Sequence, residues 1–328
     1  MPYTQLTKDE RYVITHLNNA GISYAEIARQ LGRHRATIGR EIKRNLDSFR
    51  QYHYEPAQRQ AQTRATQANQ RYKLDEPDLK QSVLDGLKKH WSPEQIAGRL
   101  RRKYPKKPSS WITHEAIYQW IYREHTQGND VYTCLRKCRS RRRNRLVGKR
   151  KSNIPNRVGI EKRPKIVDSR SRHGDWESDT VEGQKGTGVL MTHVDRKSRF
   201  LVVGKLPNKQ ANTLSEHTCQ HMKDLPACLR RTMTADNGTE FTQFNTIESV
   251  LSLKVYFANP HSPWERGTNE NMNGQIREFF PKGTDFRTVS DAEVAKVQSL
   301  LNNRPRKCLN FRTPLEVLNA LPGVALRN

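Results

Sequence analysis

The stretch WESDTVEGQKGTGVLMTHVDRKSRFLVVGKL, residues 176–206, decides the fold class because it holds three strand-like runs in succession. These runs, and two later ones that alternate with helix-like segments, are 176–183, 188–195, 199–206, 230–238 and 254–259. Three consecutive strands followed by alternation are typical of an α/β domain with an antiparallel start. Residues 168–328 are therefore expected to form a domain with a mixed five-stranded sheet and a helical C-terminal tail.

Three isolated acids stand out in this domain because nothing local requires an acid at their positions. Asp179 lies within the first predicted strand, Asp236 lies where a strand ends in an Asn-Gly turn, and Glu270 lies early in a predicted helix. Carboxylates from three such elements can converge at one edge of a sheet. Hard divalent cations such as Mg²⁺ bind through few carboxylates, and two such ions serve phosphodiester chemistry. We expect these acids to hold metal, with Asp179 bridging two ions.

Each acid taken alone has a simpler explanation. An aspartate in a strand is more often an ion-pair partner, and Asp-Asn-Gly is a common turn. The combination of the three is the more specific observation, because segments with helix-turn-helix patterns precede it at 22–45 and 90–124.

The charge balance favours a nucleic-acid partner. The 328 residues include 59 Lys and Arg against 33 Asp and Glu, a net charge of +26. Such an excess attracts polyanions, with a membrane surface as the rival to nucleic acid. No apolar run is long enough to cross a bilayer, and MPYTQLTKDE at the N-terminus is no secretory signal. A cytoplasmic, nucleoid-associated protein with reduced cysteines and no membrane partner is expected.

The segment ISYAEIARQLGRHRATIGREIKRN, residues 22–45, predicts a helix-turn-helix. Ser23 followed by Glu26 is a capping box that marks a helix start, and Gly32 lies where the chain must turn into a second helix. The residues left on the outer face, and expected to enter a DNA major groove, are Arg33, His34, Arg35, Thr37 and Arg40. The plainer alternative is a helical hairpin with a basic surface.

Residues 90–124 repeat this theme with a longer turn. Ser92 caps one helix with Pro93 in its first position, and Thr113 caps a second helix. The side chains expected on the outer face are His114, Glu115, Tyr118 and Gln119. A helical bundle that only packs is the competing interpretation, and it is a stronger competitor here than in the first unit.

Five zones are expected along the chain. They are a first helix-turn-helix domain at 1–55, a linker or exposed helix at 56–74, a second helix-turn-helix domain at 75–135, a basic linker at 136–167, and the α/β domain at 168–328. The start of the basic linker, residues 136–151, holds ten Lys or Arg and no acid. Arg141, Arg142 and Arg143 are therefore expected to lie on phosphates, although a flexible tether is the plainer interpretation.

These motifs together resemble the insertion sequence thirty family of bacterial transposases, within the DDE superfamily that includes retroviral integrases. The resemblance covers nearly the whole chain and is carried by EIARQLGRHRATIGREIKRN, WSPEQIAGRL, HGDWESDTVEG, ADNGTEF, HSPWERGTNENMNGQIREFFPKGTDF and LNNRPRKCLNFRTPLEVL. The 33 residues between Asp236 and Glu270 also match the family's spacing. The resemblance implies a ribonuclease H-like catalytic domain behind two all-α helix-turn-helix domains.

The resemblance also implies roles for individual residues. Asp179, Asp236 and Glu270 become the DDE triad, which holds two Mg²⁺ ions, with Mn²⁺ as a possible substitute. Implied DNA contacts or neighbours of the metal site are Asn237, Arg266, Asn269, Asn273 and Arg277. Asn273 and Arg277 follow Glu270 by about one and two helical turns, so they can share its face or pack on the sheet. Glu177 and Asp195 are nearby acids that are weaker candidates for metal binding, and Asp195 stands where the family commonly has Glu.

The implied reaction acts on double-stranded DNA, at terminal inverted repeats and at a target. Water hydrolyses the element's end and exposes a 3′-hydroxyl, which then attacks another phosphodiester in line, with no covalent enzyme intermediate. A homo-oligomeric synapse, dimeric or higher, and a circular intermediate with abutted ends are implied as well.

Competing functions and sites stay open. A regulator with an inactive catalytic domain, a nuclease that cuts without joining, and a structural nucleic-acid-binding protein are the other functions. A zinc site is the competing metal site, with candidates Cys134, Cys138, His217, Cys219, His221 and Cys228, but their grouping is not clean. No Walker-type phosphate loop is present. The aromatic residues expected to be core or stacking residues are Trp176, Trp264, Phe279 and Phe280.

Overall fold

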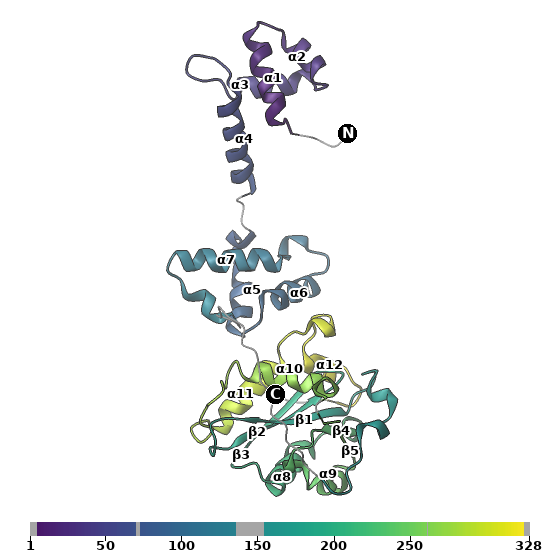
Figure 1. The fold of residues 1–328 in the computed structure, drawn as a ribbon. Coiled ribbons are helices and arrows are strands. Elements are labelled where there is room, and N and C mark those ends of the chain that lie inside the picture. The colour runs from purple at the N-terminus through teal and green to yellow at the C-terminus, as the bar shows by residue number, and fades with distance from the viewer. Residues whose placement is uncertain (1–4, 70–72, 136–153, 261, 325–328) are drawn as a thin grey trace. The chain divides into compact units, whose positions relative to one another are not determined.

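The computed structural model describes residues 5–69, 73–135, 154–260 and 262–324, without the side chains of 66–69 and 263 (Figure 1). The chain divides into two compact units, Met1–Pro77 and Asp78–Asn328. Within the described ranges, no helix combines the length and apolar character needed to cross a membrane.

The described part of the first unit holds four α-helices, and the second and third form the predicted helix-turn-helix. Their bounds are α1 Lys8–Asn19, α2 Tyr24–Gln30, α3 Arg35–Lys43 and α4 Tyr54–Asn69. The Ser23 side chain caps α2 by accepting a hydrogen bond from the Glu26 backbone N–H, and Gly32 turns the chain at a φ of +60°. Ile27 and Ile38 are fully buried between the helices. The predicted helix start and turn are confirmed.

The first unit continues past the predicted boundary at residue 55. α4 begins at Tyr54, and Ala57 on α4 is buried in the same core as Ile14 of α1. The predicted linker or exposed helix, 56–74, is therefore largely a helix of the first unit. Its polar composition hid the contacts through which it packs, which are buried Ala57 and the ring of Tyr54 against Tyr12.

A buried charge network ties α3 to α1. The carboxylate of Glu41 is fully buried and accepts hydrogen bonds from Arg11 Nε at 2.7 Å, Arg44 Nε at 3.0 Å and Asn45 Nδ2 at 3.0 Å. Burial disfavours the charged carboxyl group, but the hydrogen bonds from Arg44 and Arg11 outweigh it and hold the pKa of Glu41 below its ordinary value. The orientation of α3 thus depends on a charged residue inside the core.

A second helical group opens the second unit. Its helices are α5 Pro77–Lys88, α6 Pro93–Lys103 and α7 His114–Thr126. Ser92 and Gln95 form a capping box around Pro93, and Thr113 caps α7, as the sequence predicts. This group lies in the same compact unit as the α/β domain, so the structure does not separate 75–135 from 168–328 as the sequence boundaries suggested.

One mixed five-stranded sheet forms the centre of the α/β domain, in the order β3-β2-β1-β4-β5. The strands are β1 Asp175–Glu182, β2 Val189–Asp195, β3 Leu201–Leu206, β4 Thr232–Ala235 and β5 Lys254–Phe257. β1, β2 and β3 pair antiparallel, whereas β4 runs parallel to both β1 and β5. The predicted fold class, helical N-terminal units followed by an α/β domain with a mixed five-stranded sheet, is confirmed.

Helices cover both faces of this sheet (Figure 1). Their bounds are α8 Ala211–Met222, α9 Phe244–Leu251, α10 Gly267–Ile276, α11 Asp291–Asn302 and α12 Pro314–Asn319. Successive residues of β2 serve opposite cores, because side chains alternate along a strand. Val189 and Met191 pack with α8 and α9, whereas Leu190 and Val194 pack with α10 and α11.

Short 3₁₀ helices connect these elements. They are η1 Lys73–Asp75, η2 Pro108–Ser110, η3 Asp130–Cys134, η4 Ile160–Lys162, η5 Lys165–Val167, η6 Ala227–Leu229, η7 Thr239–Phe241, η8 Pro263–Arg266 and η9 Lys307–Leu309. Two of them matter for the site, because η7 follows β4 and η8 runs directly into α10.

Candidate active site and DNA-binding surface

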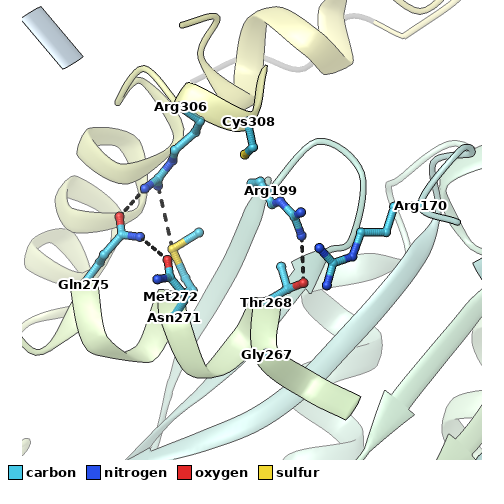
Figure 2. A pocket seen from close by; sticks show the side chains of 9 residues that line it. All are labelled: Arg170, Arg199, Gly267, Thr268, Asn271, Met272, Gln275, Arg306 and Cys308. Carbon is cyan, nitrogen blue, oxygen red and sulfur yellow. Dashed lines mark hydrogen bonds between the residues drawn. The ribbon is translucent and has the colours of Figure 1, made fainter. Parts of the chain in front are cut away.

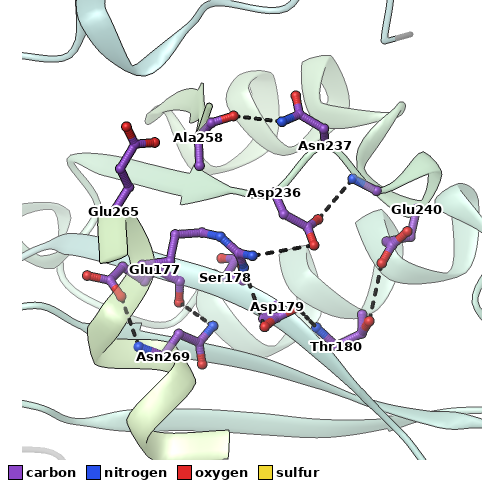
Figure 3. Close-up of polar contacts among 12 residues, drawn as sticks. Glu177, Ser178, Asp179, Thr180, Asp236, Asn237, Glu240, Ala258, Glu265 and Asn269 are labelled. Carbon is purple, nitrogen blue, oxygen red and sulfur yellow. Dashed lines mark hydrogen bonds and ion pairs between the residues drawn. The ribbon is translucent and has the colours of Figure 1, made fainter. Parts of the chain in front are cut away.

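Two of the three predicted catalytic acids lie next to each other at the end of the parallel strand pair. β1 and β4 pair with Glu177 opposite Thr234. Two residues further along each strand direction, this register brings Asp179 on β1 level with Asp236, which directly follows β4. Figure 3 shows both side chains on the same side of the sheet. The convergence predicted from the sequence therefore holds for this pair.

One guanidinium group occupies the space between these two acids. Arg266 Nη1 lies 3.4 Å from Asp179 Oδ2, and Arg266 Nη2 lies 3.5 Å from Asp236 Oδ2. Arg266 Nη1 also donates to the main-chain oxygen of Ser178 at 3.2 Å. Since Arg266 ends η8, the segment that leads into α10 reaches the acid pair through a basic side chain.

Further hydrogen bonds fix both carboxylates. Asp179 accepts from Asn273 Nδ2 at 3.0 Å and from the Thr180 backbone N–H at 2.8 Å, and Asp236 accepts from the Gly238 backbone N–H at 2.9 Å. Burial raises the pKa of Asp179 above its ordinary value, the neighbouring guanidinium opposes that rise, and Asp236 adds to it. A raised pKa at a partly buried carboxyl group is typical of functional sites.

Glu270 is the acid that the structure leaves apart from this pair. It is exposed on α10, one helical turn after Arg266 and three residues before Asn273, both of which reach Asp179. Among the described residues, no three His, Cys, Asp or Glu side chains are close enough to hold a metal ion. The role of Glu270 stays a prediction.

The donor chemistry at this place fits a divalent cation. Mg²⁺ and Mn²⁺ take oxygen ligands, carboxylates above all, and the pair Asp179 and Asp236 supplies two of them. The cationic group of Arg266 already lies between these carboxylates, so the fold holds positive charge where a metal would supply it.

Glu177 and Asp195, the weaker candidates for metal binding, have hydrogen-bond or ion-pair partners within the fold. Glu177 is fully buried, accepts a hydrogen bond from the Asn269 backbone N–H at 2.9 Å, and lies 3.4 Å from Arg196 Nη1. Asp195 is also buried and accepts from the Ser198 backbone N–H and hydroxyl at 2.9 and 2.8 Å. Glu177 therefore ties the start of α10 to β1, and Asp195 shapes the turn between β2 and β3.

Amide side chains on α10 hold the helix against the sheet. The Thr192 hydroxyl on β2 lies 3.1 Å from the Oδ1 atoms of both Asn269 and Asn273. Asn269 Nδ2 also donates to the main-chain oxygen of Glu177 at 3.1 Å, and Asn269 is fully buried. Asn269 thus holds α10 to the sheet, whereas half-buried Asn273 also donates a hydrogen bond to Asp179 of the acid pair.

Sequence reasoning missed a buried acid beside the site. Glu240 in η7 is 3% exposed, accepts from the Thr180 hydroxyl at 3.2 Å, and lies 2.9 Å from Lys209 Nζ. Its charge also contributes to the raised pKa of Asp179. The signal in the sequence is its position four residues after Asp236, inside the motif ADNGTEF.

Two other predicted contact residues are held within the fold. Asn237 Nδ2 donates to the main-chain oxygen of Ala258 at 2.6 Å, and Asn237 Oδ1 accepts from Arg157. Arg277 Nη2 donates to the main-chain oxygen of Glu182 at 2.6 Å. These bonds fix both side chains within the α/β domain.

The five residues predicted to contact DNA in the first unit are exposed or half-buried, but two of them also have partners within the unit. Arg33 donates to Glu10 at 2.8 and 3.1 Å, and His34 caps α3 by accepting a backbone N–H through Nδ1. The exposed or half-buried residues of α3 that were predicted to contact DNA are Arg35, Thr37 and Arg40. Arg33 and His34 thus shape the turn, and Arg35 and Arg40 remain the stronger candidates for base contacts.

The predicted outer face of α7 also lies at the surface. Its residues are exposed His114, Glu115 and Gln119 and half-buried Tyr118. Tyr118 stacks on Tyr122 with ring centroids 6.5 Å apart, and Gln119 donates to Glu115 at 3.4 Å. Arg141, Arg142 and Arg143 lie outside the described residues.

The four aromatic residues named from the sequence have different surroundings. Trp176 is fully buried and donates to the main-chain oxygen of Leu229 at 2.7 Å. Phe280 is buried in the core under α10 and α11, and Phe279 packs against that core. Trp264 is exposed in η8, two residues before Arg266.

Three of the six candidate zinc ligands, His217, Cys219 and His221, lie on α8. His217 and His221 stack with ring centroids 6.2 Å apart, and His221 Nδ1 lies 2.9 Å from the main-chain oxygen of His217. In the part of the chain that the structure describes, these residues belong to no group of three metal-binding side chains. Cys138 lies outside that part.

Comparisons with known proteins agree with this arrangement of elements. A family model described as a helix-turn-helix domain matches residues 2–45. The chain is 37% identical over 318 residues to the transposase for insertion sequence element IS4351 of Bacteroides fragilis, which covers 95% of this chain and 94% of that protein. It is 38% identical over 331 residues to the transposase InsI for insertion sequence element IS30A of Escherichia coli strain K12, covering 98% and 84%.

Among solved structures, the catalytic core domain of BIV integrase matches 44% of this chain and 92% of its own, with a TM-score of 0.36 and 17% identity. The similarity to the two transposases, in contrast, extends over both helical groups and the α/β domain. The chain therefore belongs to the IS30 family of insertion-sequence transposases.

Proposed function

We propose that this chain binds the terminal inverted repeats of its own insertion sequence and cuts and joins DNA with divalent metal ions held by Asp179, Asp236 and Glu270. One observation carries the proposal: adjacent parallel strands hold two carboxylates around a single cationic group. Family membership supports the same chemistry, because the relatives are transposases.

The residues around the acid pair have separate tasks in this proposal. Asp179 and Asp236 hold positive charge at the reacting phosphate, and Asn273 orients Asp179 through its amide. Glu270 joins them from the side of α10 that already carries Arg266. When bound, two divalent ions supply Lewis-acid stabilisation of the attacking and leaving oxygens.

Arg266 exchanges its partners in this scheme. Its guanidinium neutralises both acids, at 3.4 and 3.5 Å. Metal ions held by the acids would supply that positive charge instead, and Arg266 would then be available to a phosphate oxygen of the DNA, a partner that guanidinium groups bind in a bidentate manner.

Two transfers at phosphorus follow from this arrangement. In the first, water attacks the phosphodiester at the element's end, and the 3′-oxygen leaves and takes up a proton. In the second, that 3′-hydroxyl attacks a target phosphodiester in line, loses its proton, and displaces another 3′-oxygen. A synapse of two or more protomers would bring both ends to one target.

An assay on labelled element ends with Mg²⁺ tests this function against its alternatives. Nicked product together with joined product supports the transposase, nicks alone indicate a nuclease, and neither product indicates a DNA-binding protein without catalytic activity. Omitting Mg²⁺ is expected to abolish both products, and adding Mn²⁺ is expected to restore them.

Replacing Arg35 or Arg40 by alanine is expected to weaken binding of the element ends. Both side chains are exposed on α3, the helix that would enter the major groove. If one of them contacts a guanine edge, its loss should cost about 1–3 kcal/mol and relax specificity at that base. Fluorescence anisotropy with end and mutated-end duplexes measures both effects.

Arg29→Ala is the matched control, because Arg29 lies on α2, has a side chain that is 77% exposed, and carries the same charge. If both the Arg35 and the Arg40 variants bound the element ends with wild-type affinity, α3 would have no part in DNA recognition.

A further inference from the structure

A second basic site lies on the flank of α10 that faces away from the acid pair. A cavity of about 280 Å³ opens there, far larger than the roughly 10–15 Å³ that one water needs. Thr268 and Gln275 line the cavity from α10. At 3.6 residues per turn they lie on the opposite side of the helix from Arg266 and Asn273. The cavity is therefore separate from the candidate active site.

Three guanidinium groups enter this cavity from different parts of the chain. Figure 2 shows Arg170 and Arg199 near Thr268, and Arg306 near Gln275. Arg199 Nη1 donates to the Thr268 hydroxyl at 2.7 Å, and Arg306 donates to the Gln275 side chain. Within the described residues, the side chain of Arg170 has neither a hydrogen bond nor an ion pair.

Acids in its walls do not balance the charge of this cavity, because none of the described residues that line it is acidic. Asp168 and Asp175, the acids next to Arg170 in sequence, are paired with Arg163 and Arg172 instead. Like charges gathered in a small space repel one another, so an anion in the cavity would be stabilised.

The shape of the lining favours an oxyanion with several acceptor atoms. Guanidinium groups offer planar pairs of donors that match phosphate oxygens. The cavity also reaches Gly267 and Thr268, the first residues of α10, where the helix dipole favours negative charge. The backbone N–H of Gly267 itself donates to the main-chain oxygen of Trp264, so the donors that face the cavity are side chains.

We propose that this cavity binds a phosphodiester group of the DNA backbone, other than the phosphate that reacts at Asp179 and Asp236. The inference rests on the proposed function for the identity of the anion. α10 would then contact DNA phosphates on two sides, about one helix diameter, roughly 10 Å, apart. The cavity thereby sets the position of the strand relative to the acids.

The test uses the full chain and a joined duplex of element end and target, in which single phosphates are replaced by neutral methylphosphonates. The double variant Arg170→Gln/Arg199→Gln removes two charges and keeps most of the side-chain length. We expect it to bind the unmodified duplex roughly 10-fold more weakly. Its plot of log affinity against log salt should be shallower by about 0.9 for each phosphate that the variant no longer neutralises.

The decisive measurement is whether the effect of a methylphosphonate on affinity depends on the two arginines. One methylphosphonate position should weaken binding by the wild type and leave binding by the double variant unaffected. Arg231→Gln/Arg287→Gln, which removes two exposed arginines elsewhere in this domain, should respond at that position like the wild type.

Two outcomes would overturn the proposal. In the first, every methylphosphonate weakens binding by the double variant as much as binding by the wild type. In the second, inorganic phosphate raises the melting temperature of the wild type but not of the double variant, and no methylphosphonate position affects the two proteins differently. The cavity would then be a site for a free anion. Nicking by the wild type on the same duplex tests the proposed function separately, so failure of the cavity and failure of the function are distinguishable.

Discussion

Asp236→Asn is expected to abolish cleavage of labelled element ends and to leave DNA affinity unchanged. Asparagine has the same shape, and its Oδ1 can still accept the Gly238 backbone N–H that Asp236 accepts at 2.9 Å, so the turn after β4 is kept. The substitution removes one of the two negative charges around Arg266. Loss of even an outer partner of a metal ligand costs about 10- to 100-fold, so nicking should fall by more than about 100-fold.

The matched control is Asp224→Asn, the same chemical change at an exposed position of the same domain. Anisotropy gives the affinity and a gel of nicked ends gives the rate. Nicking by Asp236→Asn at the wild-type rate would mean that the acid pair has been assigned wrongly.

Glu270→Gln in the same assay is expected to lose nicking as strongly. This variant tests the acid that the structure leaves exposed and apart from the other two. Normal cleavage by Glu270→Gln, with none by Asp236→Asn, would show that another acid completes the site. Glu240, bonded to Thr180 next to Asp179, would then be the next candidate.

Glu41→Leu is expected to destabilise the first unit by about 3–5 kcal/mol, because it leaves the side chain of Arg11 buried without its carboxylate. For a unit of this size, that loss lowers the melting temperature by at least about 12 °C. The α/β domain should be unaffected, since it lies in the other compact unit. Hydrogen exchange measured by mass spectrometry is expected to show faster exchange in α1 and α3 and unchanged exchange in the sheet.

The control for this prediction is Glu26→Gln. It removes an ion pair with Arg29 that lies at the surface, a change worth at most about 1 kcal/mol. The double variant Arg11→Met/Glu41→Leu should recover much of the lost stability, because both buried charges are then gone. A double variant as unstable as Glu41→Leu would mean that the buried charge is not the cause.

The same network predicts a loss of stability in acid. The folded chain lowers the pKa of Glu41, so this group stabilises the first unit fully above the ordinary glutamate range, about pH 4.3. That contribution is lost as the pH falls from there through the lowered pKa. Unfolding of the first unit measured from pH 6 downward should therefore show a dependence that Glu41→Leu no longer has.

The sequence predicted most of the fold because its elements have strong local signals. Ser23, Gly32, Ser92 and Thr113 mark helix starts and a turn through the chemistry of their own backbone positions. The strands around β2 were predictable because their apolar side chains are buried on both faces. α4 was missed as part of the first unit because a single buried alanine, Ala57, gives no periodic pattern.

The candidate site was predictable only in part. Asp179 and Asp236 were found because acids in apolar strands are unusual, and the parallel pairing then places them at one level. The position of Arg266 between them, and the burial of Glu240, depend on how η8 and η7 fold back onto the sheet. No local pattern encodes such interactions between segments far apart in the chain.

The pairing of β1 with β4 also determines where the chain can tolerate changes of length. Because side chains alternate along a strand, a single residue inserted between Glu177 and Asp179 would turn Asp179 to the opposite face of the sheet. An insertion in the exposed loop at 223–224, after α8, leaves that alternation intact. Natural relatives should therefore differ in length at such loops and keep β1 and β4 free of insertions and deletions.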